Sequence, residues 1–262
     1  MPFAPIERAI YKRNPLKEVV FQVRFPKFLL IDTEPPAAFQ QLIIKEFPIY
    51  EQRNVFRILF ASPPQDAASV PAEIPGRLHA FISADRVWTV TLAGDSLTVS
   101  TSAYRRWEDF RKRVRDAVGP LLQVYPLQIF TRFGLRYQNA IEREALNLDG
   151  RPWGELLKPH IAGEFLGGAV AESDFVAKNT VVTAKLDDGD MLLFRHGLGT
   201  NSQTQRQAYL IDADYYNEQQ RAANLDDTLT IADRLHVHSG RLFRWCISDV
   251  LHTAMEPESI PS

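Results

Sequence analysis

The sequence predicts an α+β protein, in which mostly antiparallel sheets pack against two long amphipathic helices. Segments with an apolar residue at every second position follow one another in runs, between two long stretches with helical periodicity at about 104–124 and 230–255. A doubly wound fold would instead alternate single strands with single helices. Each long helix is therefore expected to bury one apolar stripe against a sheet.

The first strand is expected at residues 18–25, EVVFQVRF. Its apolar side chains face one side, and Glu18 and Arg24 face the other. A helix is predicted over the following stretch, TEPPAAFQQLIIKEFP, with Thr33 as its N-terminal cap. Residues 61–76 contain four prolines, which predicts a long surface loop.

An antiparallel strand pair is predicted next, with strand character on either side of turns at Ala84–Asp85 and Gly94–Asp95. After the first long helix, residues 131–142 return to a period of two. Arg132 and Arg136 then lie on the face opposite to a row of apolar side chains.

The chain is expected to divide into two halves, residues 1–145 and 146–262, packed as one body. Residues 145–170 are poorly periodic and interrupted by proline and glycine, which predicts short helical turns at the junction. Three strands are expected beyond it, at about 171–186, 190–197 and 207–216. Each half would then contain a strand meander and a long helix, so the halves are candidates for similar sheet-plus-helix units.

Composition favours a well-packed cytoplasmic protein. Of the 262 residues, 45% are hydrophobic, and 30 basic against 32 acidic residues give a formal charge of −2. A nearly neutral chain argues against a protein dedicated to nucleic acid. The single cysteine excludes an internal disulfide, and neither a signal peptide nor a membrane-spanning segment is expected.

The segment LHVHSGRLFRWCISDVLH contains three of the six histidines and the only cysteine. Helical spacing places Cys246 in the apolar stripe, where it acts as a small hydrophobic residue. The same spacing places His238, Asp249 and His252 on the opposite flank, and Thr230 predicts the start of the helix. Only Asp249 and His252 could share a metal ion, so an ordinary packing helix is favoured over a metal site.

Asp212 and Asp214 are two residues apart, which places both carboxylates on the same face of a strand. Such pairs hold Mg²⁺ in metal-dependent enzymes. Neither a third acid nearby nor a phosphate-binding glycine turn is evident. A metal-dependent enzyme acting on nucleotides or nucleic acid through Asp212 and Asp214 is therefore the alternative function, and no metal or cofactor is favoured.

The polar faces of two predicted strands supply the candidate binding residues, Glu18, Arg24, Arg132 and Arg136. If the strands are neighbours, Glu18 could pair with Arg136 or Arg132, which would give an ordinary charged sheet surface. Alternatively, arginines with donors left after pairing would hold an anion or an acidic partner. This face is the preferred recognition surface.

Four short motifs follow one another in a characteristic order: NPLKEVVFQVRFP, FQQLIIKEFP, WEDF and FGLRYQNAIE. The most specific are NPLxEV, beginning at Asn14, and GLRYxN, beginning at Gly134. Over nearly its whole length the chain resembles a sporadically distributed family of uncharacterised bacterial proteins of about 260 residues. The resemblance implies a bacterial cytoplasmic protein, and its patchy distribution implies an accessory role in a defence or toxin-neutralising system.

The expected function is that of a non-catalytic binding or interaction protein. Catalytic signatures such as a GxSxG elbow or an HExxH helix are absent from the sequence. The expected partner is another protein or a second copy of the chain. Nucleic acid is less favoured, because acidic residues interleave with the basic ones of the helix at 104–124, and no membrane partner is expected.

Overall fold

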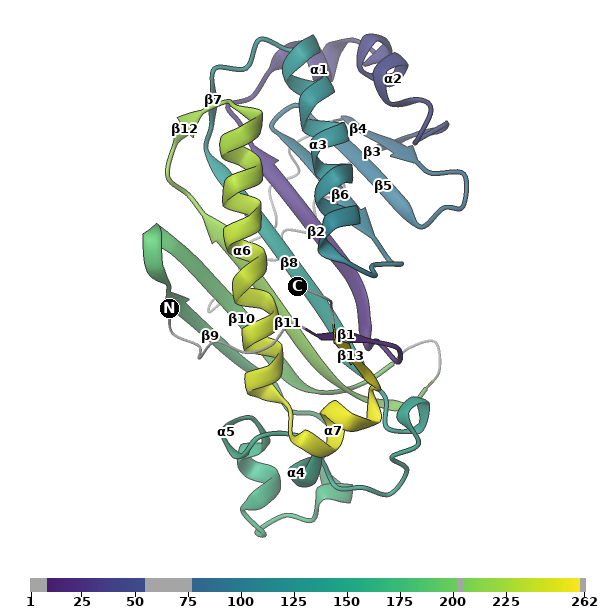
Figure 1. Ribbon diagram of the computed structural model, residues 1–262, viewed down its shortest axis with the longest axis vertical. Coiled ribbons are helices and arrows are strands. Elements are labelled where there is room, and N and C mark those ends of the chain that lie inside the picture. Colours follow the sequence, from purple (N-terminus) through teal and green to yellow (C-terminus); the bar gives the residue numbers. More distant parts are fainter. Residues whose placement is uncertain (1–8, 55–76, 202–204, 260–262) are drawn as a thin grey trace.

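The centre of the fold is one antiparallel sheet of nine strands, with two long helices across one of its faces (Figure 1). The computed structural model describes residues 9–54, 77–201 and 205–259. In spatial order the sheet contains β3 (Ile49–Asn54), β4 (Arg77–Ile82), β5 (Trp88–Ala93), β6 (Ser96–Thr101), β2 (Leu16–Arg24), β8 (Arg132–Ile141), β11 (Gln207–Asn217), β10 (Asp190–Thr200) and β9 (Thr180–Lys185). The predicted α+β class is confirmed.

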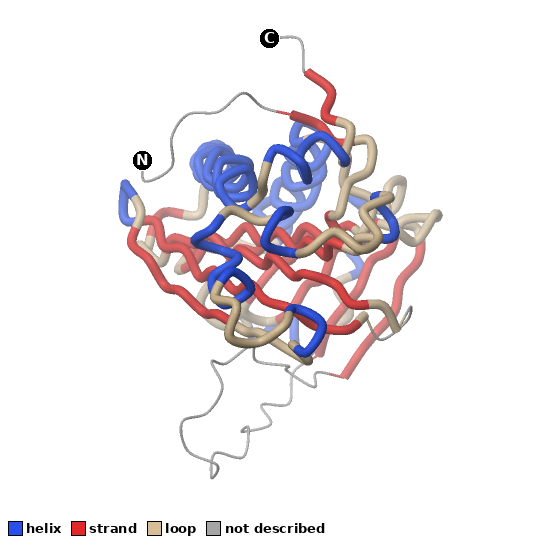
Figure 2. The backbone as a smooth tube through the Cα atoms, turned by 90° about the horizontal axis from the view of Figure 1, so that it is seen from below, coloured by secondary structure: helices blue, strands red, loops and turns tan. Residues whose placement is uncertain are grey.

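The two long helices are α3 (Trp107–Val124) and α6 (Leu225–Cys246), and both lie on the same side of the sheet (Figure 2). Short helices and turns connect the strands: α1 (Leu29–Thr33), α2 (Ala37–Ile43), η1 (Glu144–Leu146), α4 (Trp153–Leu156), α5 (Pro159–Ala162), η2 (Gly163–Leu166), η3 (Glu172–Asp174), η4 (Asp187–Gly189) and α7 (Asp249–Ala254). Two small strand pairs complete the fold, β1 (Ala9–Tyr11) with β13 (Pro257–Ser259) and β7 (Ile129–Phe130) with β12 (Arg221–Ala222).

The core lies between the sheet and the long helices, as periodicity predicts. Alternate residues of β2 and β8 are buried, including Phe21 and Leu135, and they meet the apolar stripes of α3 and α6. Phe110 and Leu235 belong to these stripes and are fully buried. Each large apolar side chain removed from water contributes roughly 1.5–3 kcal/mol, so these helices are held mainly by the sheet beneath them.

The order of elements repeats along the chain. β2 is followed by short helices, a strand meander and α3, and β8 is followed by short helices, a strand meander and α6. β2 and β8 pair at the centre of the sheet, so the sheet continues across both repeats. The second repeat thus begins at Arg132, ahead of the predicted boundary at residue 145. The division into halves 1–145 and 146–262, packed as one body, stays a prediction.

The predicted helix start at Thr33 is wrong. Thr33 is the last residue of α1, and its hydroxyl donates to the carbonyl oxygens of Leu29 and Leu30 at 3.2 and 3.3 Å. Glu34 is extended, and α2 begins after Pro36. Proline disfavours the helical conformation of the residue before it, so the two prolines separate two short helices.

The helix predicted at about 230–255 is correct in its buried stripe but not in its ends. α6 begins five residues before Thr230, where the Asn224 side chain accepts a hydrogen bond from the Asp227 N–H at 3.0 Å. Cys246 is buried, as predicted, whereas His238, expected on the outer flank, is also buried. The strand expected from residue 171 begins only at β9, and the loop predicted at 61–76 lies outside the described residues.

Candidate functional site

The predicted recognition residues lie on the face of the sheet that α3 and α6 do not cover. β2 pairs with β8, so that Arg24 lies opposite Arg132. In the same register, Val20 lies opposite Arg136. Glu18 is two residues from Val20 along β2 and therefore shares this polar face.

Arg136 and Arg132 are each bound by a carboxylate of the next strand, β11. The Nε and Nη2 atoms of Arg136 donate to the two oxygens of Asp212, at 2.7 and 2.6 Å. Nη2 of Arg132 donates to Asp214 at 2.9 Å, and its guanidinium lies over the Tyr216 ring. The two pairs form charge-assisted hydrogen bonds at the centre of the sheet face.

The structure thus gives both arginines carboxylate partners other than the predicted Glu18. Burial raises the pKa of Glu18 above its ordinary value. The positive charge of the nearby Arg136 lowers the pKa of Glu18 by a smaller amount. The sequence could not indicate this outcome, because the partners come from a strand on the other side of β8.

Asp212 and Asp214, the alternative metal ligands, share one face of β11, as the sequence indicates. Arginine guanidinium groups contact both carboxylates, and their positive charge opposes the approach of a cation. Among the residues that the structure describes, no group of three or more His, Cys, Asp or Glu side chains could hold a metal ion. The two proposed metal ligands are thus already paired with arginines, and the enzyme alternative stays a prediction.

Replacing Asp212 by asparagine should lower the free energy of unfolding by about 1–3 kcal/mol, because the guanidinium of Arg136 would lose a charged acceptor. Arg136 and Asp212 are only 16% and 18% exposed, so water would replace that acceptor poorly. Urea denaturation measures the change. Glu155→Gln is the control, since its exposed pair with Arg151 should contribute at most about 0.5 kcal/mol. Equal losses in the two variants would contradict the assigned role of Asp212.

Two of the three histidines of the C-terminal segment, and its aspartate, have ordinary partners, whereas the ring nitrogens of the buried His238 form no hydrogen bond with a described residue. His236 Nδ1 forms a hydrogen bond with the Tyr137 hydroxyl at 2.8 Å, and His252 Nδ1 forms one with the Tyr11 hydroxyl at 2.9 Å. Asp249 accepts from Arg244 at 2.5 Å. His252 and Asp249 therefore have separate partners, in agreement with a packing helix.

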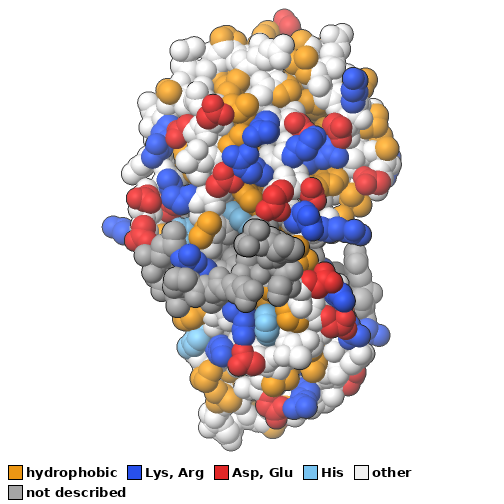
Figure 3. Space-filling view, viewed as in Figure 1, with side chains coloured by type: hydrophobic (Ala, Val, Ile, Leu, Met, Phe, Trp, Pro, Cys, Tyr) orange, Lys and Arg blue, Asp and Glu red, His pale blue; other side chains and the backbone are white. Residues whose placement is uncertain are grey.

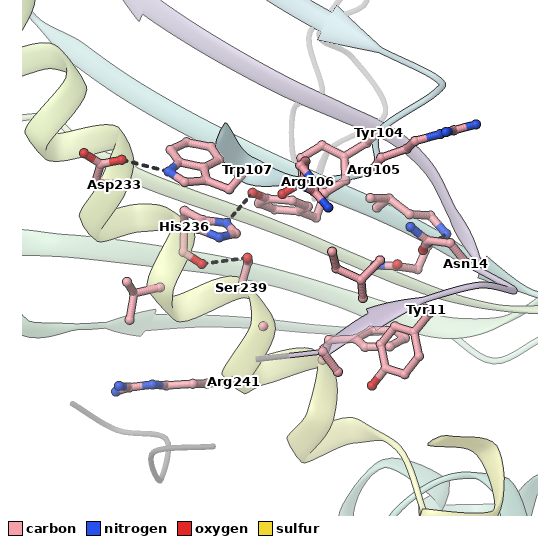
Figure 4. A pocket seen from close by; sticks show the side chains of 18 residues that line it. Tyr11, Asn14, Tyr104, Arg105, Arg106, Trp107, Asp233, His236, Ser239 and Arg241 are labelled. Carbon is pink, nitrogen blue, oxygen red and sulfur yellow. Dashed lines mark hydrogen bonds between the residues drawn. The ribbon is translucent and has the colours of Figure 1, made fainter. Parts of the chain in front are cut away.

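A second site, which the sequence analysis did not identify, lies on the helix side of the sheet. A pocket of about 450 Å³ opens between β1, the start of α3, β8 and the middle of α6 (Figure 4). This volume is within the usual range for sites that hold small organic ligands. Aromatic rings form much of its wall: Tyr11, Tyr104, Trp107, Tyr137 and Phe243.

One wall of the pocket is fixed by contacts between α3 and α6. The Trp107 ring stacks on His236 with 4.3 Å between centroids. Nε1 of Trp107 donates to Asp233 at 2.7 Å, and Nε of Arg111 donates to both oxygens of the same carboxylate. Burial raises the pKa of Tyr137 well above its ordinary value, so this hydroxyl stays neutral at physiological pH. These contacts join α3 to α6 at this wall of the pocket.

The side of the pocket nearest the sheet includes residues from the two most specific sequence motifs. Asn14 and Leu16 line the pocket from NPLxEV, and Tyr137 and Asn139 line it from GLRYxN. Leu16 pairs with Asn139 where β2 begins beside the end of β8, so the two motifs meet there. The Asn14 side chain accepts a hydrogen bond from the Leu16 N–H at 3.0 Å, which holds the turn.

Positive charge predominates at the pocket. Arg105, Arg106 and Arg241 border it, and Asp233 is the one carboxylate among its described lining residues. Asp233 is already bound by Arg111. Elsewhere on this side of the molecule, basic and acidic side chains are interspersed (Figure 3), which agrees with a self-paired surface on α3.

The pocket could not be predicted as a site because its lining residues come from separate segments of the chain. β1, the two motifs, the start of α3 and the middle of α6 meet only after the sheet has formed. The nearest local signal was the Ser239-Gly240 pair inside a predicted helix, but such a pair indicates a close helix contact or a bend and not a ligand site. In the structure, a Cβ atom added to Gly240 would meet no heavy atom of another described residue within 4 Å.

Comparisons with known proteins name no relative: no protein-family model matches the chain, and no curated protein matches it. No described helix is long and apolar enough to span a bilayer. The functional proposal consequently rests on the chemistry of the described residues.

Proposed function

We propose that the protein is a non-catalytic binding protein that holds a small organic ligand in the pocket between β1, α3 and α6. The observation that carries the proposal is the pocket itself, about 450 Å³ in volume and bordered by aromatic rings. Ligand sites combine such apolar walls with a small number of placed polar groups. Asn14, Asn139 and Ser239 are polar groups of this kind.

The contacts of the pocket wall support binding and not catalysis. His236, the histidine that borders the pocket, stacks on Trp107 and bonds to the neutral Tyr137 hydroxyl. Ser239 donates to the His236 carbonyl oxygen at 2.8 Å, so its hydroxyl is not activated by a base. The polar groups hold the wall in place, which favours a ligand that is recognised without being transformed.

Substitutions of Gly240 test the proposal, because this position borders the pocket and no described residue would obstruct a Cβ atom there. Gly240→Ala adds one methyl group and should raise the free energy of unfolding by about 0.5–1 kcal/mol through helix propensity. Gly240→Trp should fill part of the pocket without unfolding the helix. Saturation-transfer NMR with indole, benzoate and adenine as probes should show binding to the wild type and to Gly240→Ala, and no binding to Gly240→Trp.

Equal signals from the wild type and Gly240→Trp would place the probes elsewhere and contradict the proposal. Absence of any signal from the wild type at millimolar probe concentrations would also contradict it. Recognition of another protein or of a second copy through the face around Arg136 stays a separate prediction. A cytoplasmic location and an accessory role in a bacterial defence or toxin-neutralising system likewise stay predictions.

A further inference from the structure

We infer that the ligand of this pocket is a nucleoside monophosphate or a close analogue, that is, a planar nitrogen heterocycle joined to an anionic group. The inference rests on the proposed function as a small-molecule binding protein and specifies its ligand. Three features of the pocket support it: the faces of its aromatic rings, the side-chain amide groups of two asparagines, and more arginines than carboxylates.

The aromatic side chains suit a planar ligand. Tyr104 meets Tyr137 edge to face, with 5.8 Å between centroids, and Tyr11 meets Phe243 in the same way at 5.9 Å. Figure 4 places Tyr104 and Tyr11 on opposite sides of the pocket. A nucleobase stacks readily on such rings, because every base presents a π face.

Two asparagine side chains supply hydrogen-bonding groups for the edge of a heterocycle. Asn14 uses its Oδ1 atom to accept from Leu16, and Asn139 uses its Nδ2 group to donate to the Ile211 carbonyl oxygen at 3.3 Å. The Nδ2 group of Asn14 and the Oδ1 atom of Asn139 have no partner within the part of the chain that the structure describes. A donor and an acceptor together match the edge of a base, which presents both kinds of group.

The charges at the pocket favour an anionic ligand. Arg105 and Arg106 form no ion pair with any residue that the structure describes. Figure 4 shows Arg106 beside the rings of the pocket, whereas the guanidinium of Arg105 points outward. Arginine binds phosphate through parallel N–H donors, so Arg106 is the residue assigned to the phosphate group. The neutralised Asp233 would repel the phosphate little.

Isothermal titration calorimetry tests this assignment with AMP, GMP, CMP and UMP, the four corresponding nucleosides, and inorganic phosphate. At least one nucleotide should bind roughly 10-fold or more tightly than its nucleoside, because a charge-assisted contact is added. Inorganic phosphate alone should give no saturable binding at millimolar concentration, because it cannot use the rings.

Two variants separate the contributions. Arg106→Gln should reduce the affinity for the nucleotide to that for the nucleoside and leave the affinity for the nucleoside unchanged. Asn14→Ser keeps a side-chain oxygen as acceptor for the Leu16 N–H and removes the amide donors without adding a charge, so it should weaken nucleoside and nucleotide alike. The control is Arg115→Gln, which removes the same charge from an exposed position of α3 outside the pocket and should change neither affinity.

The outcomes distinguish this inference from the proposed function. Equal binding of nucleosides and nucleotides, or no effect of Arg106→Gln, would overturn the inference. A second result would also overturn the inference: none of the nucleotides binds, but indole or benzoate binds the wild type and does not bind Gly240→Trp. That result would leave the proposed small-molecule function intact. If no nucleotide, nucleoside or small aromatic probe binds the wild type, both the inference and the proposed function are contradicted.

Discussion

Replacing Asp190 by alanine should lower the free energy of unfolding by about 3 kcal/mol or more. Asp190 is fully buried at the start of β10, and its carboxylate accepts from Nε and Nη2 of Arg234, both at 2.7 Å. Nδ2 of Asn217 donates to the same carboxylate at 2.8 Å. Alanine would leave the guanidinium of Arg234, only 23% exposed, without its counter-charge. Breaking a buried pair by removing one partner is strongly destabilising, and urea denaturation measures the loss.

Asp116→Ala provides the matched control for that substitution. Asp116 pairs with Lys112 at 2.7 Å on the outer surface of α3, four residues apart. An exposed pair of this spacing contributes about 0.3–0.5 kcal/mol. A loss for Asp190→Ala as small as that for Asp116→Ala would show that the buried cluster between β10 and α6 does not stabilise the fold.

The stability of the protein should fall as the pH decreases from about 6.5 to 4, and His196 should be a principal cause. His196 is 5% exposed, and burial, with a smaller contribution from Lys178, lowers the pKa of His196 from 6.5 to about 4. Between these values the unfolded chain binds a proton that the folded chain does not. The free energy of unfolding should therefore decrease by up to about 1.4 kcal/mol per pH unit, about 3 kcal/mol in total. Above about pH 7 the imidazole is neutral in both states, and this effect disappears.

The His196→Asn variant isolates the contribution of this residue. His196 Nδ1 forms a hydrogen bond with the Tyr209 hydroxyl at 2.7 Å, and the same hydroxyl lies 3.2 Å from the Ile161 carbonyl oxygen. Asparagine keeps an N–H donor near that position but does not titrate. Urea denaturation at a series of pH values should give a shallower acid loss for His196→Asn than for the wild type. A control variant of the exposed His160, His160→Asn, should keep the slope of the wild type, and identical slopes in all three proteins would contradict the assignment.

The strands were predictable where the signal is local. β2 and β8 alternate buried apolar residues with more polar ones over most of their length, and the sequence predicts both strands to within two residues of their ends. The contact between Arg136 and Asp212 joins residues 76 positions apart. Periodicity contains no information on which strands become neighbours, so the faces were predictable and their ion pairs were not.

The two incorrect helix starts have a common cause. Thr33 and Thr230 were assigned as caps from their residue type, but both hydroxyls donate to carbonyl oxygens one turn earlier in the same helix. A threonine inside a helix can satisfy its hydroxyl in this way. Sequence alone does not distinguish this role from capping, and Asn224 is the residue that caps α6.

The most direct test of binding in the pocket is a two-dimensional NMR titration of nitrogen-15-labelled protein with the tightest-binding probe of the two panels. Backbone amide signals should shift in the segments 104–107, 137–139 and 236–243, which contain residues that line the pocket. Signals on the other face of the sheet, around Arg132 and Asp214, should remain unchanged. Shifts centred on that face, with none around Trp107 and His236, would contradict the assignment of the pocket as the binding site.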